Sequence, residues 1–115
     1  MDITERKTAE KILLEQKKVL YYQANYDSLT GIPNRMLLLD RLENAIKKSK
    51  RQPYKLAILF IDLDHFKKIN DSLGHGAGDK VLIEVTNRLT SLVRAEDTVA
   101  RLGGDEFTIF LENIT

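Results

Sequence analysis

Apolar and polar residues follow two different periods along this chain, and each change of period marks a predicted element. Residues 4–25 contain no glycine or proline and carry apolar residues at near-heptad spacing, which predicts one long helix. The apolar stripe consists of Ala9, Ile12, Leu13, Val19, Leu20 and Tyr26, and two glutamines, Gln16 and Gln23, interrupt it. This pattern fits a short coiled coil, a helix docked on the rest of the chain, or a solvated linker helix.

A turn-rich segment, residues 26–35, ends this first helix, and Pro33 opens a second one over residues 34–49. The second helix places its apolar residues on one face, namely Leu38, Leu42, Ala45 and Ile46. A basic tract follows, made of Lys47, Lys48, Lys50, Arg51 and Lys55. Because no aromatic residues are interleaved with these charges, we interpret the tract as a solvated helix end and loop rather than a phosphate-binding patch.

Residues 56–61 form an unbroken apolar run, which predicts a central strand covered on both faces. The run ends at Asp62-Leu63-Asp64, and strand alternation would put both carboxylates on one face. A short helix is expected over residues 65–73, a flexible loop over residues 74–79, and a further helix over residues 79–94. The apolar face of that last helix comprises Val81, Leu82, Val85, Leu89 and Leu92.

Two apolar runs near the end of the chain, residues 98–102 and 107–111, flank the sequence Gly103-Gly104-Asp105-Glu106. Such a pattern predicts a β-hairpin with an acidic turn, since glycines tolerate positive φ and let a ligand approach the backbone. The order of elements predicts an α/β or α+β domain. We expect a mixed sheet with helices on its faces and the first strand beside the hairpin.

Composition narrows the class of protein. The chain has 115 residues with 18 Lys+Arg and 17 Asp+Glu, a net charge of +1, so no global field predicts a nucleic-acid partner. It contains no cysteine, which excludes disulfides and thiolate metal sites. Its longest apolar run is far below the roughly 20 residues of a membrane span. We therefore expect a single cytoplasmic domain.

Pairing the first strand with the hairpin would gather four carboxylates, Asp62, Asp64, Asp105 and Glu106. Joint ionisation of such a cluster favours a hard divalent cation, and Mg²⁺ commonly combines a few protein carboxylates with water and substrate phosphates. Lys67 could then neutralise charge that builds on a phosphate, and the first amides of its helix could donate to phosphate oxygens. An amide and a carboxylate, Asn70 and Asp79, can together meet the Watson–Crick edge of guanine.

The same residues resemble the GGDEF family, the diguanylate cyclases, over residues 26–115. Gly103 to Phe107 spells the family signature letter for letter. The segment from Asp62 to Asp71 matches the family's Asp-x-Asp-x-Phe-Lys-x-x-Asn-Asp pattern, and Leu73-Gly74-His75 with Gly78-Asp79 matches the segment that follows. The turn from Asp27 to Arg35 is similar to the Asp-x-Leu-Thr-Gly-Leu-x-Asn-Arg entry of these domains, with Ile32 at the usual leucine position.

The resemblance implies a nucleotide-cyclase-like fold and a role for each matching residue. In the family, two GTP-loaded domains meet as a homodimer and form cyclic di-GMP and pyrophosphate. The resemblance implies catalytic roles for Asp105, Glu106 and Lys67, and GTP contacts for Phe66, Asn70, His75, Asp79, Gly103 and Gly104. Its implied ligands for Mg²⁺, or Mn²⁺ in its place, are Asp62, the Leu63 carbonyl and Asp105. An Arg-x-x-Asp pair before the hairpin, Arg94 and Asp97, resembles the family's inhibitory product site.

The flanks of the domain depart from the family pattern. Residues 1–25 are expected to be a linker helix, and the opening from Asp2 to Lys7 resembles the end of a PAS sensor domain. The family's domain continues beyond the position of Thr115, so we expect a C-terminally truncated, inactive fragment. Pro33-Asn34-Arg35 and the PAS-like opening resemble multidomain proteins that carry a downstream cyclic di-GMP phosphodiesterase domain, and this resemblance implies such a domain here. The alternatives are a non-catalytic regulatory module that binds GTP or cyclic di-GMP, and a helix-mediated interaction domain.

Overall fold

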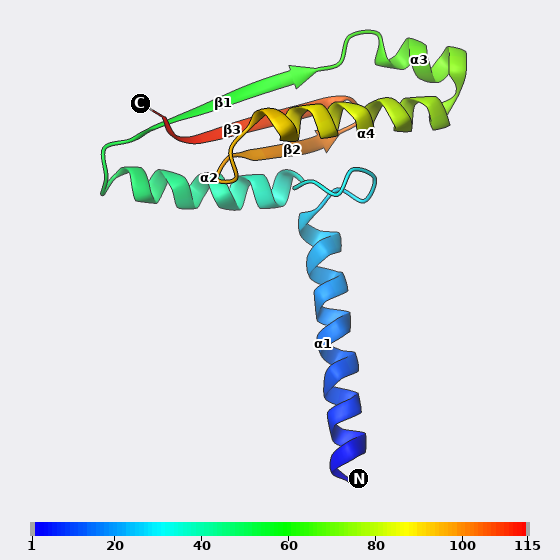
Figure 1. Ribbon diagram of the computed structural model, residues 1–115, viewed down its shortest axis with the longest axis vertical. Helices are drawn as coiled ribbons and strands as arrows, with labels where there is room; N and C mark the ends of the chain where they lie inside the picture. The colour runs from blue at the N-terminus through cyan, green and yellow to red at the C-terminus, as the bar shows by residue number, and fades with distance from the viewer. Residues whose placement is uncertain (1, 115) are drawn as a thin grey trace.

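The computed structural model describes residues 2–114, which form seven elements in chain order (Figure 1). These are helix α1 (Ile3–Asn25), helix α2 (Arg35–Ser49), strand β1 (Lys55–Asp62), helix α3 (Phe66–Leu73), helix α4 (His75–Leu92), strand β2 (Thr98–Gly103) and strand β3 (Glu106–Ile114). The prediction of two N-terminal helices, a strand, two further helices and a hairpin is confirmed in type and order.

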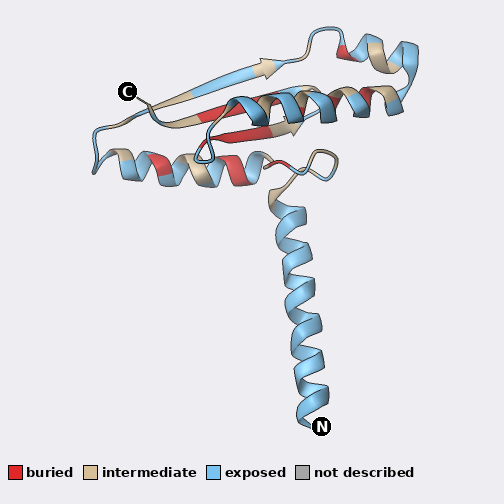
Figure 2. Cartoon of the chain, in the orientation of Figure 1, coloured by how far each residue is buried: buried red, intermediate tan, exposed pale blue. Residues whose placement is uncertain are grey.

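Helix α1 projects away from the rest of the domain as a single rod (Figure 1). Asp2 caps its first turn, since the carboxylate accepts a hydrogen bond from the Glu5 amide at 2.8 Å. The helix has no buried residue, and Figure 2 shows it exposed along almost its whole length. A helix docked on the domain is therefore excluded, while a coiled coil and a solvated linker both stay compatible with the structure. Within residues 2–114 no helix is both long and apolar enough to cross a bilayer.

The three strands form one sheet in the order β1-β3-β2. Strand β3 pairs antiparallel with both neighbours, so the first strand lies beside the hairpin as predicted. Within residues 2–114 no pair of strands is parallel, and the described sheet is antiparallel rather than mixed.

Helices cover both faces of this sheet, because alternate residues of the hairpin point to opposite sides. Phe107 and Ile109 pack in one apolar cluster with residues of α3 and α4. Phe110 and Ala100, both fully buried, pack on the other side with Leu38 of α2. The α+β class and the placement of helices on the sheet faces are thereby confirmed.

Three local predictions are wrong. Strand β1 lies at the edge of the described sheet, and its Phe60 is 77% exposed rather than covered on both faces. Residues 75–79 are not a loop, since α4 already begins at His75. That helix ends at Leu92, whose side chain is exposed instead of buried, and Arg94 lies beyond it.

Candidate functional site

The carboxyl end of β1 and the β2–β3 turn are joined at one end of the sheet (Figure 1). Asp62, the last residue of β1, lies opposite Glu106, the first residue of β3. Immediately beyond, the Leu63 amide donates a hydrogen bond to the Asp105 carbonyl at 3.2 Å. Antiparallel pairing thus brings Asp62, Leu63, Asp105 and Glu106 together, and of the four carboxylates that the sequence predicts here, Asp64 lies beyond the end of strand β1.

The two glycines of the turn adopt backbone conformations that a side chain would strain. Gly103 has φ of 152° and Gly104 has φ of 50°, both in the positive range that favours glycine. Gly103 still pairs with Glu106 across the hairpin. The turn can therefore be tight and at the same time carry two adjacent carboxylates towards the end of β1.

The carboxylates at this turn and at the end of β1 repel one another. The carboxylate of Asp105 is the largest of several causes that raise the pKa of Asp62 above its ordinary value. Partial loss of water, a hydrogen bond with Asp105 and the charges of Glu106 and Asp64 add to the shift. Each carboxylate makes ionisation of its neighbour less favourable, and a cation bound between them would reverse this effect.

Asp64 does not belong to the strand, so alternation does not set its direction. Strand β1 ends at Asp62, and the Asp64 carboxylate lies 3.3 Å from Nε2 of His65 with its side chain 89% exposed. In the part of the chain that the structure describes, no three His, Cys, Asp or Glu side chains are grouped closely enough to hold a metal ion. A cation here would have to combine the carboxylates of Asp62 and Asp105 with a backbone carbonyl and with non-protein oxygens. Such a donor set suits Mg²⁺, which usually keeps several waters or substrate oxygens.

Helices α3 and α4 form a corner beside this end of the sheet (Figure 1). Phe66 opens α3 and is buried in the core, whereas Lys67 is exposed. No side chain caps the first turn of α3, so its leading amides are open to an anionic ligand. Asn70 is half-buried on α3, and His75 and Asp79 are exposed on the first turns of α4.

Arg101 and Asp27, to which the sequence-based prediction gave no role, connect the hairpin to the turn that precedes α2. The guanidinium of Arg101 donates to both carboxylate oxygens of Asp27 at 3.1 Å and to the Gly104 carbonyl at 3.0 Å. Burial alone would raise the pKa of Asp27, but hydrogen bonds from Thr30 and Arg101 outweigh it and lower that pKa. Arg101 stands two residues before Gly103 and Asp27 opens the Asp-Ser-Leu-Thr turn, but nothing in the sequence indicates that the two side chains pair.

Arg94 and Asp97 lie at the opposite end of the hairpin, where α4 leads into β2 (Figure 1). The Asp97 side chain is only 2% exposed, and it accepts hydrogen bonds from the Arg94 amide, the Arg94 guanidinium and the Glu112 amide at 2.9–3.3 Å. Burial alone would raise the pKa of Asp97, but these hydrogen bonds hold it below its usual value. The Arg94 side chain is 48% exposed and also reaches Glu96 at 3.2 Å, so only the arginine of this pair faces solvent.

The family model described as "Diguanylate cyclase, GGDEF domain" matches residues 24–115. The chain belongs to the GGDEF domain family. A bifunctional diguanylate cyclase/cyclic di-GMP phosphodiesterase, MucR of Pseudomonas aeruginosa, is 52% identical over 87% of this chain and 15% of its own length. The diguanylate cyclase TpbB of the same species is 48% identical over 86% of this chain and 23% of its own length. The chain thus spans less than a quarter of these curated relatives.

Solved GGDEF domains share the fold. A structure of the GGDEF domain alone of TpbB from P. aeruginosa aligns with a TM-score of 0.76 at 48% identity, covering 78% of this chain and 52% of that one. A structure of the coiled coil and GGDEF domain of DgcB from Caulobacter crescentus, in complex with cyclic di-GMP, aligns with a TM-score of 0.90 at 26% identity. That alignment covers 98% of this chain and 59% of the other, so it includes helix α1.

Proposed function

We propose that this GGDEF domain is the GTP-binding and catalytic unit of a diguanylate cyclase, and that it acts with a divalent cation. The observation that carries the proposal is the junction of β1 with the hairpin turn. There the Leu63 amide bonds to the Asp105 carbonyl, and the Asp105 carboxylate raises the pKa of Asp62. Paired carboxylates of this kind, beside a helix start without a side-chain cap, suit a nucleotide triphosphate with its cation.

The proposed reaction joins two GTP molecules held by two copies of the domain. The 3′-hydroxyl of each GTP attacks the α-phosphorus of the other and loses its proton, and pyrophosphate leaves each time. Two GTP therefore give one cyclic di-GMP and two pyrophosphates. Bound Mg²⁺, held by Asp62, Asp105 and the Leu63 carbonyl, would supply charge neutralisation at the phosphates. We assign to Lys67, which is exposed on α3, the stabilisation of negative charge on the transferring phosphate, and to Glu106 a supporting role in the site.

Base recognition is assigned to the corner of α3 and α4. Guanine presents two adjacent donors, N1 and N2, and an acceptor, O6, on its Watson–Crick edge. The carboxylate of Asp79 can accept from both donors, and the carboxamide of Asn70 can complete the edge. Adenine lacks the paired donors, which gives this corner a physical basis for preferring GTP.

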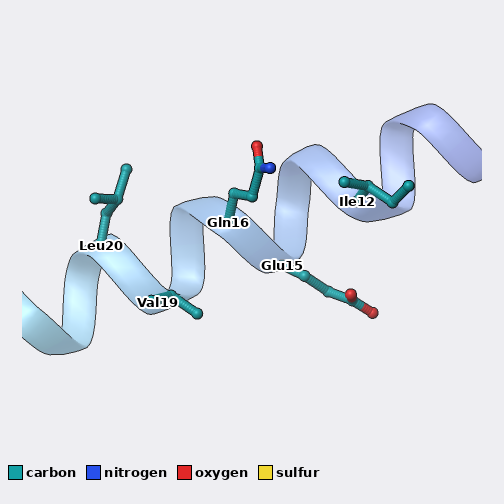
Figure 3. A pocket seen from close by; sticks show the side chains of 5 residues that line it. All are labelled: Ile12, Glu15, Gln16, Val19 and Leu20. Atoms are coloured by element: carbon teal, nitrogen blue, oxygen red, sulfur yellow. The ribbon is translucent and has the colours of Figure 1, made fainter.

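The partner that catalysis requires is a second copy of the same chain. Helix α1 exposes an apolar stripe that nothing in the described chain covers, and Figure 3 shows Ile12, Val19 and Leu20 on it together with Gln16. Ile12, Val19 and Leu20 are each at least 50% exposed. Burial of such a stripe against a second helix is the usual way to stabilise it, and we propose a parallel coiled coil of two α1 helices.

We propose a separate binding site for the product, cyclic di-GMP, at Arg94. The Arg94 side chain is half exposed and is oriented by the buried Asp97 carboxylate, which is an arrangement that can bind a phosphate or a guanine acceptor. A PAS-type sensor upstream, a phosphodiesterase domain downstream and a cytoplasmic location stay predictions from the sequence.

The decisive experiment compares GTP affinity of the purified chain with and without Mg²⁺. We expect Mg²⁺ to strengthen GTP binding in the wild type, and Asp62→Asn and Asp105→Asn to reduce that gain about tenfold, because each removes one charged ligand. Asp71→Asn, an exposed carboxylate of α3 outside the site, is the matched control and should keep the full gain. An equal gain in all four proteins would refute the metal assignment.

A further inference from the structure

The corner between α3 and α4 contains a close backbone approach that the proposed roles do not use. Gly78, in the first turns of α4, is buried although its neighbours Gly76 and Asp79 are exposed. A Cβ atom built on Gly78 would lie 1.8 Å from Oδ1 and 2.9 Å from Cγ of Asn70, and 3.3 Å from Cζ of Phe66. The carboxamide of Asn70 therefore lies in the space that any other residue at position 78 would fill.

The backbone around this slot is held from both sides. The Asn70 carbonyl accepts a hydrogen bond from the Gly74 amide at 2.9 Å, and the Gly74 carbonyl accepts one from the Gly78 amide at 3.3 Å. Phe66, one turn before Asn70, is anchored in the core. These contacts fix the backbone of α3 at Asn70 and the backbone of α4 at Gly78. Only the direction of the Asn70 side chain can then vary, and the absence of a side chain at Gly78 determines that direction.

We propose that Gly78 is a positioning residue for guanine recognition, acting by keeping open the slot that orients the Asn70 carboxamide. This inference rests on the proposed function and deepens it. With Oδ1 turned towards Gly78, the Nδ2 end of the carboxamide, which carries its two donors, faces away from that glycine, and in the proposed guanine site it is the donor that complements the acceptor-only carboxylate of Asp79. A methyl group at position 78 displaces the end of the Asn70 side chain and breaks up this donor–acceptor pair.

We expect a side chain at position 78 to weaken guanine recognition rather than to destabilise the fold. The clashing atoms belong to the end of a flexible side chain, so Asn70 can rotate away while the helices stay packed. Alanine is also the better helix former, by about 1 kcal/mol per residue over glycine. A glycine at this position therefore needs a reason other than helix stability, and the Asn70 slot supplies one.

The test measures binding of GTP and of ATP, each with Mg²⁺, to the purified chain. Amide NMR titrations are suitable because they report weak affinities. We expect Gly78→Ala to lower GTP affinity about tenfold, the effect of one lost hydrogen bond, and to leave ATP affinity unchanged. Gly76→Ala is the matched control, because a Cβ at Gly76 meets nothing within 4 Å. It should keep the GTP preference and raise the melting temperature slightly.

A double-mutant cycle with Asn70→Ala separates positioning from a general structural role. If Gly78 acts through Asn70, Gly78→Ala should cost no further GTP affinity in the Asn70→Ala background. An undiminished cost in that background, or a Gly78→Ala protein that prefers GTP as strongly as Gly76→Ala does, would overturn the inference while the GTP site stands. A wild-type chain that binds GTP and ATP equally would contradict the proposed function itself, and this role with it.

Discussion

Replacing Arg101 by alanine should destabilise the domain far more than an ordinary surface ion pair would. The Arg101 and Asp27 side chains are only 14% and 17% exposed, and their atoms meet at 3.1 Å. Removing one partner of a fully buried pair costs about 3–5 kcal/mol, and exposed pairs are worth about 0–1 kcal/mol. For this largely buried pair we expect a loss of about 2–3 kcal/mol, because Asp27 keeps its charge and loses two of its hydrogen bonds.

The matched control is Arg88→Ala. Arg88 donates to Glu84 at 3.0 Å, but those side chains are 77% and 59% exposed, so about 0.3–0.5 kcal/mol is expected. Thermal unfolding followed by circular dichroism measures the stability of both variants. For a domain of this size the Arg101→Ala loss corresponds to a fall in melting temperature of roughly 10–20 °C. Arg101→Ala unfolding within 2 °C or so of Arg88→Ala would refute the importance of the link.

The pH dependence of the same variant gives an independent test. The pKa of Asp27 is lowered in the folded state, so its contribution to stability is present above the unfolded pKa and is lost as pH falls through the folded value. The gap between wild type and Arg101→Ala should therefore be constant near pH 7 and should narrow below about pH 4. A gap that widened on acidification would show that the pair does not stabilise the ionised carboxylate.

The other predictions concern the ligands and the partner. Asn70→Ala should weaken GTP binding and leave ATP binding unchanged by calorimetry, and equal losses would refute base reading. Arg94→Ala should weaken cyclic di-GMP binding about tenfold and, in an active full-length cyclase, raise output by relieving product inhibition; unchanged inhibition would make the pair purely structural. Val19→Lys should shift analytical ultracentrifugation profiles to the monomer, whereas the exposed Lys18→Glu should not; unaltered profiles would contradict pairing through α1.

Local patterns predicted the elements well, because their causes are local. The absence of glycine and proline explains α1, and two apolar runs around Gly103-Gly104 explain the hairpin. The pairing of β1 with the hairpin was predicted from the order of the elements, and it brings the end of β1 beside Asp105 as expected.

The errors arise where tertiary packing decides which residues are buried and where a helix begins. A run of apolar residues cannot say which faces are covered, so the exposure of Phe60 on an edge strand was missed. The glycines of residues 74–78 read as a loop, yet α4 includes Gly76 and Gly78, because packing at the corner overrides a weak propensity. The Asp27–Arg101 link joins residues 74 positions apart, and no single-sequence pattern encodes such a contact.

The most direct test of the central claim is a titration of the chain with substoichiometric Mn²⁺, followed by line broadening in amide NMR spectra. If Asp62, Asp105 and the Leu63 carbonyl hold the cation, the signals of residues 62–64 and 103–106 should broaden first. Excess Mg²⁺ should restore them, and Asp105→Asn should abolish the effect. Broadening that begins elsewhere, or that persists in Asp105→Asn, would contradict a metal site at the junction of β1 and the hairpin.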